Sequence, residues 1–171
     1  MAILKIEKHE RYTLNGMIEY LRDTKIHEGK VYYFGSIYAS PNNPLIDMMN
    51  IKMLWNQVGG RQYRHIVLSL PEEESCAEYY NAFLSVSWNA ANFIARYFGC
   101  QVVFAIHANT DNIHTHFVLN SVRFTDGKKI QISKIDTVKL KEMINKNLNE
   151  FGFNNVYYLK TFYKSNDYYD I

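Results

Sequence analysis

Residues 105–120 read Ala-Ile-His-Ala-Asn-Thr-Asp-Asn-Ile-His-Thr-His-Phe-Val-Leu-Asn and contain three of the six histidines of the chain. An apolar run ends at His107, a polar loop follows, and a second apolar run begins with His114 and His116. This pattern predicts two strands, Gln101 to His107 and His114 to Arg123. Because the loop between them is short, we expect the strands to pair as an antiparallel hairpin.

The hairpin brings the three histidines together. Residues two apart in a strand point to the same face, so His114 and His116 project side by side, and the returning chain places His107 close to them. Imidazole is the commonest metal ligand in proteins, and three protein ligands leave a coordination position for water or substrate. The alternative is three ordinary strand histidines, two facing solvent and one in the core. The clustering favours a catalytic metal site.

The residues before the hairpin predict two strands and two helices. Residues 2–7 alternate as a half-buried strand does. Thr13 is the expected N-cap of a helix that runs to about Arg22. One apolar stripe marks its buried face: Leu14, Met17, Ile18 and Leu21. Residues 23–43 are open between loop and short strand. The last two predicted elements are a helix over 44–58 and a buried strand over 63–70.

Helical spacing over residues 72–98 predicts one long helix. After the hairpin we expect a short strand near Ile130, a helix from Asp136 to Glu150, and an edge strand in the tyrosine-rich tail from Asn155. The resulting order of elements indicates the α+β class, with a central antiparallel or mixed sheet of about five strands flanked by helices. We expect a single domain over residues 1–171.

Composition limits the function classes. The chain has 171 residues, 47% of them hydrophobic, which is enough for one domain with a core. A net charge of +2 excludes binding nucleic acid by overall charge alone, so any DNA contact must be local. Cys76 and Cys100 show no disulfide or thiolate metal pattern. With no signal-like N-terminus and no long apolar run, we expect a cytoplasmic protein without membrane insertion.

The histidine segment resembles the third motif of the relaxase/mobilisation nuclease family, the MOBP-type conjugative relaxases among the HUH endonucleases. That motif is a histidine, six intervening residues, then His-x-His leading into an apolar strand and an asparagine, here Asn120. The resemblance implies the HUH relaxase fold and a divalent metal on His107, His114 and His116. Asp111 could support one of these ligands from behind, as could Asn120. Asp111 could equally be a turn residue.

Two further motifs agree with this family in order and spacing. The second is a strand with His-x-x-x-Ser, here His65 and Ser69, which share a face. The alternative is a core histidine and a strand-end serine. The first motif is a tyrosine in a short helix followed by a lysine, here Tyr20 and Lys25. Tyr20 lies on the flank of the apolar stripe and could lean toward the histidines or simply be a packed tyrosine. Tyr12 is the next candidate nucleophile.

The resemblance implies a DNA strand transferase that works in plasmid or transposon mobilisation. Tyr20 would attack a phosphodiester of single-stranded DNA at an origin of transfer and form a 5′-phosphotyrosine link. The family implies Mg²⁺ or Mn²⁺ in use, although Zn, Co or Ni could occupy imidazole ligands. Relaxosome accessory proteins are the implied partners. The chain is compatible with being the N-terminal part of a longer protein.

Basic residues near the motifs are the candidate DNA contacts, although ordinary solvated surface is the alternative for each. They are Arg22, Lys25, Arg64, Lys128 and Lys129. Three rival functions stay open. They are a rolling-circle replication or transposition initiator of the same endonuclease group, a hydrolytic metal phosphoesterase, and a nonenzymatic single-stranded DNA-binding module.

Overall fold

A computed structural model of the protein describes residues 2–23 and 30–161. Its helices and strands, in chain order, are β1 (Ala2–Ile6), α1 (Leu14–Arg22), β2 (Val31–Ile37), α2 (Pro44–Leu54), β3 (Tyr63–Ser69), the 3-10 turns η1 (Glu72–Glu74) and η2 (Ala77–Tyr79), α3 (Tyr80–Phe98), β4 (Val102–His107), β5 (His114–Asn120), α4 (Lys134–Glu150) and β6 (Val156–Thr161).

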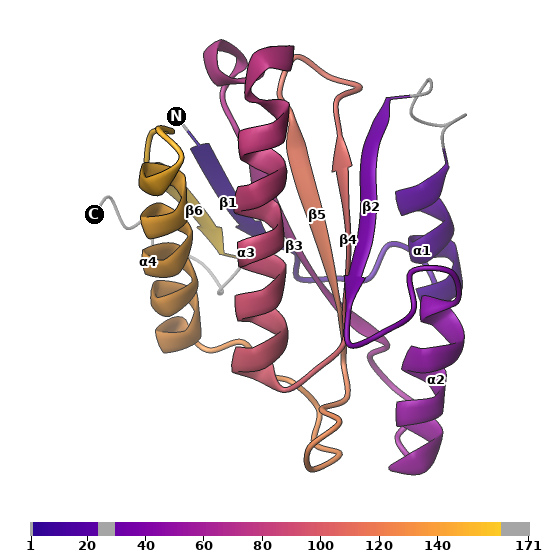
Figure 1. The fold of residues 1–171 in the computed structure, drawn as a ribbon. Helices are drawn as coiled ribbons and strands as arrows, with labels where there is room; N and C mark the ends of the chain where they lie inside the picture. The colour runs from indigo at the N-terminus through magenta and orange to yellow at the C-terminus, as the bar shows by residue number, and fades with distance from the viewer. Residues whose placement is uncertain (1, 24–29, 162–171) are drawn as a thin grey trace.

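All six strands form one sheet in the order β2-β4-β5-β3-β1-β6 (Figure 1). The first five pair antiparallel, and β6 runs parallel to β1 at the edge. The predicted α+β class with a mixed sheet is therefore confirmed, with six strands instead of about five. The predicted edge strand in the tail is β6, and residues 162–171 of that tail lie outside the described residues.

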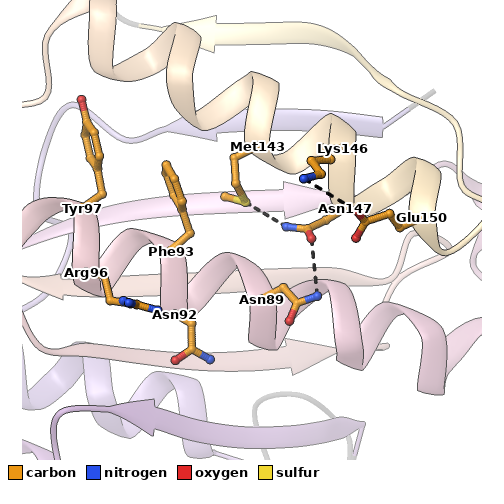
Figure 2. Close-up of a pocket in the computed structure, with 9 residues that line it drawn as sticks. All are labelled: Asn89, Asn92, Phe93, Arg96, Tyr97, Met143, Lys146, Asn147 and Glu150. Carbon is orange, nitrogen blue, oxygen red and sulfur yellow. Dashed lines mark hydrogen bonds and ion pairs between the residues drawn. The ribbon is translucent and has the colours of Figure 1, made fainter.

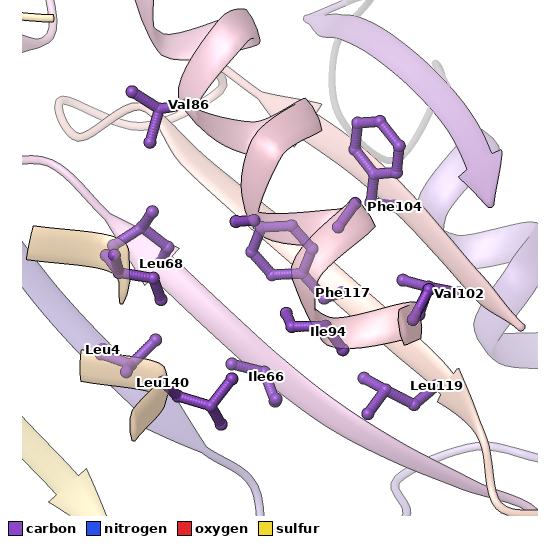
Figure 3. Packing of buried hydrophobic residues seen from close by; sticks show 14 of the residues in the cluster. Leu4, Ile66, Leu68, Val86, Ile94, Val102, Phe104, Phe117, Leu119 and Leu140 are labelled. Atoms are coloured by element: carbon purple, nitrogen blue, oxygen red, sulfur yellow. The ribbon is translucent and has the colours of Figure 1, made fainter. Parts of the chain in front are cut away.

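The two faces of the sheet pack against different helices. On one face, the apolar side chains of the strands pack against α3 and α4, which lie across the sheet in Figure 1. Figure 3 shows this cluster, including Phe104, Phe117 and Ile94. On the other face, a smaller cluster joins Val103, Ala105 and other strand residues to α1 and α2. Because strand residues alternate between faces, the three histidines lie on the α1 side.

Helix α1 begins and packs as its sequence predicts. The Thr13 side chain accepts a hydrogen bond from the Gly16 amide at 3.1 Å, which satisfies one of the amides that a helix start leaves open. The buried residues of α1 are the predicted stripe, Leu14, Met17, Ile18 and Leu21. Burial of this stripe fixes the rotation of α1 about its axis, and so fixes where its flank residue Tyr20 lies.

The prediction of one helix over residues 72–98 is wrong. The chain forms the two 3-10 turns and only then α3, because Cys76 is extended between them (φ −79°, ψ 157°). Contacts with other segments hold this irregular stretch. The Ser75 hydroxyl donates to the Pro71 carbonyl and accepts from the Ile113 amide, and buried Glu74 accepts from Asn154. These long-range contacts have no counterpart in the helical periodicity.

Smaller differences concern element ends. Residues 23–43 contain a full strand, β2, and residues 24–29 lie outside the described part. Helix α2 ends at Leu54, four residues before the predicted end, and α4 begins two residues earlier than predicted, with a capping box between Ser133 and Asp136. The expected strand near Ile130 is a single bridge, Val122 to Lys129. No helix within residues 2–23 or 30–161 is long and apolar enough to cross a membrane.

Candidate metal centre

The three histidines of the hairpin converge. His107 ends β4 and pairs in register with His114, the first residue of β5. The ring of His116 lies 4.9 Å from that of His107 and 5.0 Å from that of His114, centroid to centroid. Each of the three imidazoles offers a nitrogen, and these nitrogens lie within 4.8 Å of one another. The predicted cluster of side chains is therefore present in the structure.

Backbone carbonyls orient two of these rings. His107 Nε2 lies 3.1 Å from the Leu21 carbonyl oxygen, and His114 Nδ1 lies 2.9 Å from that of Asn112. Because a carbonyl only accepts, each of these ring nitrogens carries the proton and donates it. The unprotonated nitrogens are then His107 Nδ1, which is buried, and His114 Nε2. Such contacts behind a metal ligand fix its tautomer and raise its basicity.

A fourth histidine orients His116. His65 of β3 stacks on it at 5.1 Å, and His65 Nε2 lies 2.8 Å from His116 Nδ1. Burial lowers the pKa of His65 to about 4, so its imidazole is neutral at pH 7 and its Nε2, in the tautomer that leaves it unprotonated, accepts a hydrogen bond from Nδ1–H of His116. His116 is then left with an unprotonated, buried Nε2. In these tautomers each of the three rings has one unprotonated nitrogen, and three such nitrogens on one side of the sheet fit a divalent metal ion.

Tyr20 lies edge-on against two of these rings. Its centroid is 6.0 Å from that of His107 and 5.8 Å from that of His116. Partial burial and the neighbouring Tyr12 raise the pKa of Tyr20, while the Arg11 guanidinium acts in the opposite direction. The structure thus brings the predicted tyrosine to the edge of the histidine cluster.

A pocket of about 220 Å³ opens beside His116. Its lining comes from β1, the segment after it, α1, β3 and β5: Lys5, Glu7, Arg11, Tyr12, Met17, Tyr20, His65, Val67 and His116. Lys5 and Glu7 were not among the predicted site residues, and Lys5 Nζ lies 2.5 Å from Glu7 Oε1. The alternation of β1 is the signal that places Lys5 and Glu7 on one face. Only the strand order shows that this face borders the histidines.

Ser69 lies on the histidine side of the sheet, directly opposite His114 in the β3–β5 register. Asp111 is exposed in the loop, and the His114 nitrogen contacts the carbonyl of Asn112 instead. Asn120 ends β5, six residues from His114, and its amide donates to the Met48 carbonyl and to Gln101. The Asn120 amide thus ties β5 to α2, and the support of a metal ligand by Asp111 or Asn120 stays a prediction.

The predicted DNA-contact residues are mostly engaged within the protein. Arg22 lies 4.4 Å above the Phe34 ring and donates to the Pro41 carbonyl. Arg64 donates to the Ile130 carbonyl and lies on the face of the sheet away from the histidines, and Lys129 donates to three carbonyls of residues 57–61. Lys128 is exposed at a turn. Lys25 lies outside the described residues. The cations that line the pocket are Lys5 and Arg11.

A larger groove of about 630 Å³ lies between α3 and α4, on the opposite side of the sheet. Figure 2 shows its lining, in which Phe93 of α3 points toward α4 and Asn89 of α3 faces Asn147 of α4. The Asn147 amide bridges to Asn89 and to the Met143 sulfur. No histidine or cysteine lines this groove, so the metal-type ligands lie on the α1 side of the sheet.

The site is a cluster of three histidines that could hold a metal ion, and a tyrosine lies at its edge. Domains of this class carry such a cluster on an antiparallel sheet. A family model described as "Relaxase: MobA/VirD2-like, nuclease domain" matches residues 12–153. The chain belongs to this relaxase family, whose members are DNA-nicking enzymes of mobilisation. The recognition made from the three motifs is therefore confirmed.

Solved structures agree with the fold. One is the Mn-bound crystal structure of the MobM relaxase domain bound to plasmid pMV158 oriT DNA. Its sequence is 12% identical and the TM-score is 0.57. The match covers 91% of this chain and 88% of that chain. A structure described as "Molecular Basis of Vancomycin Resistance Transfer in Staphylococcus aureus" is 16% identical, with a TM-score of 0.52 and coverage of 78% and 76%. No curated protein sequence matches the chain significantly. At these identities the two structures show the fold.

Proposed function

We propose that this domain nicks single-stranded DNA at an origin of transfer by metal-assisted transesterification, with Tyr20 as the nucleophile. The observation that carries the proposal is the position of Tyr20, whose ring lies edge-on about 6 Å from two rings of the histidine cluster. A phosphate bound at that cluster is within reach of the phenol oxygen. The MobM relaxase domain, which shares the fold, was crystallised with oriT DNA and Mn, which supports the class of substrate.

The reaction exchanges one phosphodiester for another. The Tyr20 oxygen attacks the phosphorus in line with the departing O3′, so the bond from phosphorus to the phenol oxygen forms as the bond to O3′ breaks. The phenol proton is lost to solvent, and O3′ takes up a proton to become a free hydroxyl. The fragment 3′ of the nick remains on Tyr20 through its 5′-phosphate, and the same step in reverse rejoins the strand.

The metal ligands in this proposal are His107, His114 and His116, with Mg²⁺ or Mn²⁺ as the ion in use. A divalent ion bound there supplies Lewis-acid polarisation of the phosphate and neutralises developing charge. His65 acts on His116, and Ser69, beside His114 on the same face, is positioned to contact the DNA backbone. Arg11 and Lys5 supply positive charge along the pocket. Action in the cytoplasm with relaxosome accessory proteins is part of the proposal.

The test is a nicking assay on a labelled single-stranded oligonucleotide that spans the origin of the mobile element. With Mn²⁺ we expect a cleaved strand and a slowly migrating protein–DNA adduct on a denaturing gel, and neither with chelator. Cleavage without an adduct would identify hydrolysis. Metal-independent DNA binding without cleavage would identify a binding module.

The pH dependence of nicking follows from the raised pKa of Tyr20. Below that pKa the phenolate fraction rises about tenfold per pH unit, so we expect the single-turnover rate to increase from pH 6 to pH 9. Arg11 stabilises the phenolate, so Arg11→Gln should raise the pKa of Tyr20 and slow nicking at pH 7.5. The Arg61→Gln variant is the matched control, because Arg61 is absent from the pocket lining. A pH-independent rate, measured under single-turnover conditions, would contradict phenolate attack.

The contact between His65 and His116 predicts an effect on metal affinity. The His65→Phe variant keeps the ring and loses the acceptor for His116 Nδ1, and we expect Mn²⁺ affinity to fall about 10–100-fold. The His65→Gln variant places an acceptor oxygen close to the position of His65 Nε2 and should lose less. Isothermal titration with Mn²⁺ measures both. Equal affinity in the wild-type protein and His65→Phe would show that His65 does not orient the ligand.

A further inference from the structure

We propose that Tyr12 is a stacking platform for one DNA base, that of the nucleotide which stays linked to Tyr20 after cleavage. The inference rests on the proposed function, because it assumes that the strand passes Tyr20. It assigns a role to Tyr12, which belongs to none of the three family motifs. Base stacking on an aromatic ring is one of the main ways in which proteins hold single-stranded nucleic acid.

The position of the Tyr12 ring suits this role. It stacks on the Tyr20 ring, with centroids 5.5 Å apart and planes 22° apart. At the same time 45% of Tyr12 is exposed, although the residue lines the pocket. One face of the ring is therefore committed to Tyr20, and the ring still offers aromatic surface at the pocket mouth. A base stacked there continues the Tyr20–Tyr12 stack.

The backbone of Tyr12 is held rigidly. The hydroxyl of Tyr63, which is 1% exposed, donates to the Tyr12 carbonyl and accepts from the Tyr12 amide, at 3.2 and 3.3 Å. The Glu10 carboxylate accepts from two amides at the start of β3, and Thr13 caps α1 immediately after Tyr12. The segment is therefore bonded on both sides of the ring. A platform fixed before binding loses little conformational entropy when a base stacks on it.

The pocket below the ring is small, and two cations are among the residues that line it. Its volume of about 220 Å³ lies under the range of about 300–1,000 Å³ that larger ligands occupy. Lys5 and Arg11 line it, and a guanidinium or ammonium beside a stacked base can pair with its phosphate. Lys5 also pairs with Glu7, so Arg11 is the cation available without breaking that ion pair.

In-line attack decides which nucleotide this is. The departing O3′ lies opposite the attacking phenol oxygen, so the nucleotide that carries O3′ is directed away from Tyr20. The 5′-linked nucleotide is attached through an equatorial oxygen and stays bonded to Tyr20. Because Tyr12 contacts the Tyr20 ring itself, it lies on the nucleophile side of the phosphorus. The base next to Tyr12 is therefore the one immediately 3′ of the cleaved bond.

The first test measures stacking without chemistry. Binding of a fluorescent oligo(dT) 12-mer is followed by anisotropy in chelator at low salt, where no cleavage occurs. We expect Tyr12→Ala to weaken binding about tenfold or more and Tyr12→Phe to bind as the wild-type protein does. Tyr38→Ala removes a more exposed tyrosine outside the pocket and should have little effect. Unchanged binding by Tyr12→Ala, or equal loss in Tyr12→Phe, overturns the platform.

The second test assigns the side, using an origin oligonucleotide whose cleaved bond has been mapped. An abasic site immediately 3′ of that bond should remove the affinity difference between the wild-type protein and Tyr12→Ala, whereas one immediately 5′ should preserve it. The reverse result overturns the assignment. Failure of the proposed function is distinct, because it removes the adduct in the nicking assay and leaves the oligo(dT) comparison intact.

Discussion

Replacing Tyr20 with phenylalanine is expected to abolish the covalent protein–DNA adduct and to lower nicking by at least about 10³-fold. Loss of a nucleophile removes the covalent route altogether, and only the rate supplied by the rest of the site remains. The change deletes one oxygen from a partly buried ring, so the contacts of the ring with His107 and His116 are kept. A denaturing gel with labelled single-stranded origin DNA and Mn²⁺ reads out both products.

Tyr12→Phe is the matched control for this substitution. Tyr12 lines the same pocket and stacks on Tyr20. The control therefore removes a tyrosine hydroxyl from the same pocket but keeps the proposed nucleophile, Tyr20. We expect an adduct from Tyr12→Phe and none from Tyr20→Phe. The opposite pattern would make Tyr12 the nucleophile. Cleavage at the wild-type rate by both variants would indicate hydrolysis by water.

Removal of one metal ligand has the second large expected effect. In His114→Ala we expect Mn²⁺ affinity to fall by more than about 100-fold and nicking to be lost at micromolar Mn²⁺. Loss of a group behind a ligand already costs about 10–100-fold, and a direct ligand costs more. His114 is the best position for the test because it is partly exposed, whereas His107 is fully buried and its removal would leave a cavity.

The control for the metal experiment is His9→Ala. His9 is exposed and belongs neither to the histidine cluster nor to the pocket lining. Isothermal titration with Mn²⁺ and circular dichroism of both variants separate ligand loss from unfolding. If folded His114→Ala bound Mn²⁺ as tightly as the wild-type protein, the three-histidine centre would not be the metal site.

Much of the architecture is local enough to be predicted. The stripe of α1, its Thr13 cap and the β4–β5 hairpin depend on neighbours in the sequence, so periodicity and spacing identify them. The predicted helix over residues 72–98 failed for the opposite reason. Its first part is held by contacts of Ser75 with Ile113 and of Glu74 with Asn154, which lie far away in the chain.

The candidate site also has a part that local sequence patterns predict and a part that depends on the tertiary structure. The spacing of His107, His114 and His116 determines that they converge, because a hairpin and a two-residue alternation suffice, and the helical wheel places Tyr20 on the flank of α1. The contacts that orient the three histidines and Tyr20 depend on the tertiary structure alone. The strand order brings His65 against His116 and the Lys5 face of β1 to the pocket, through a register that no local pattern specifies.

The sequence by itself therefore determined the family, the class of chemistry and the chemical groups of the centre, since these follow from residue types at short spacings. Only the tertiary structure decided which partner each of these histidine nitrogens meets, which cations reach the pocket, and that Arg64 and Lys129 bind the protein's own carbonyls instead of facing the site. The physical reason is that a hydrogen-bond partner is chosen by distance in space, and strands far apart in the chain set that distance.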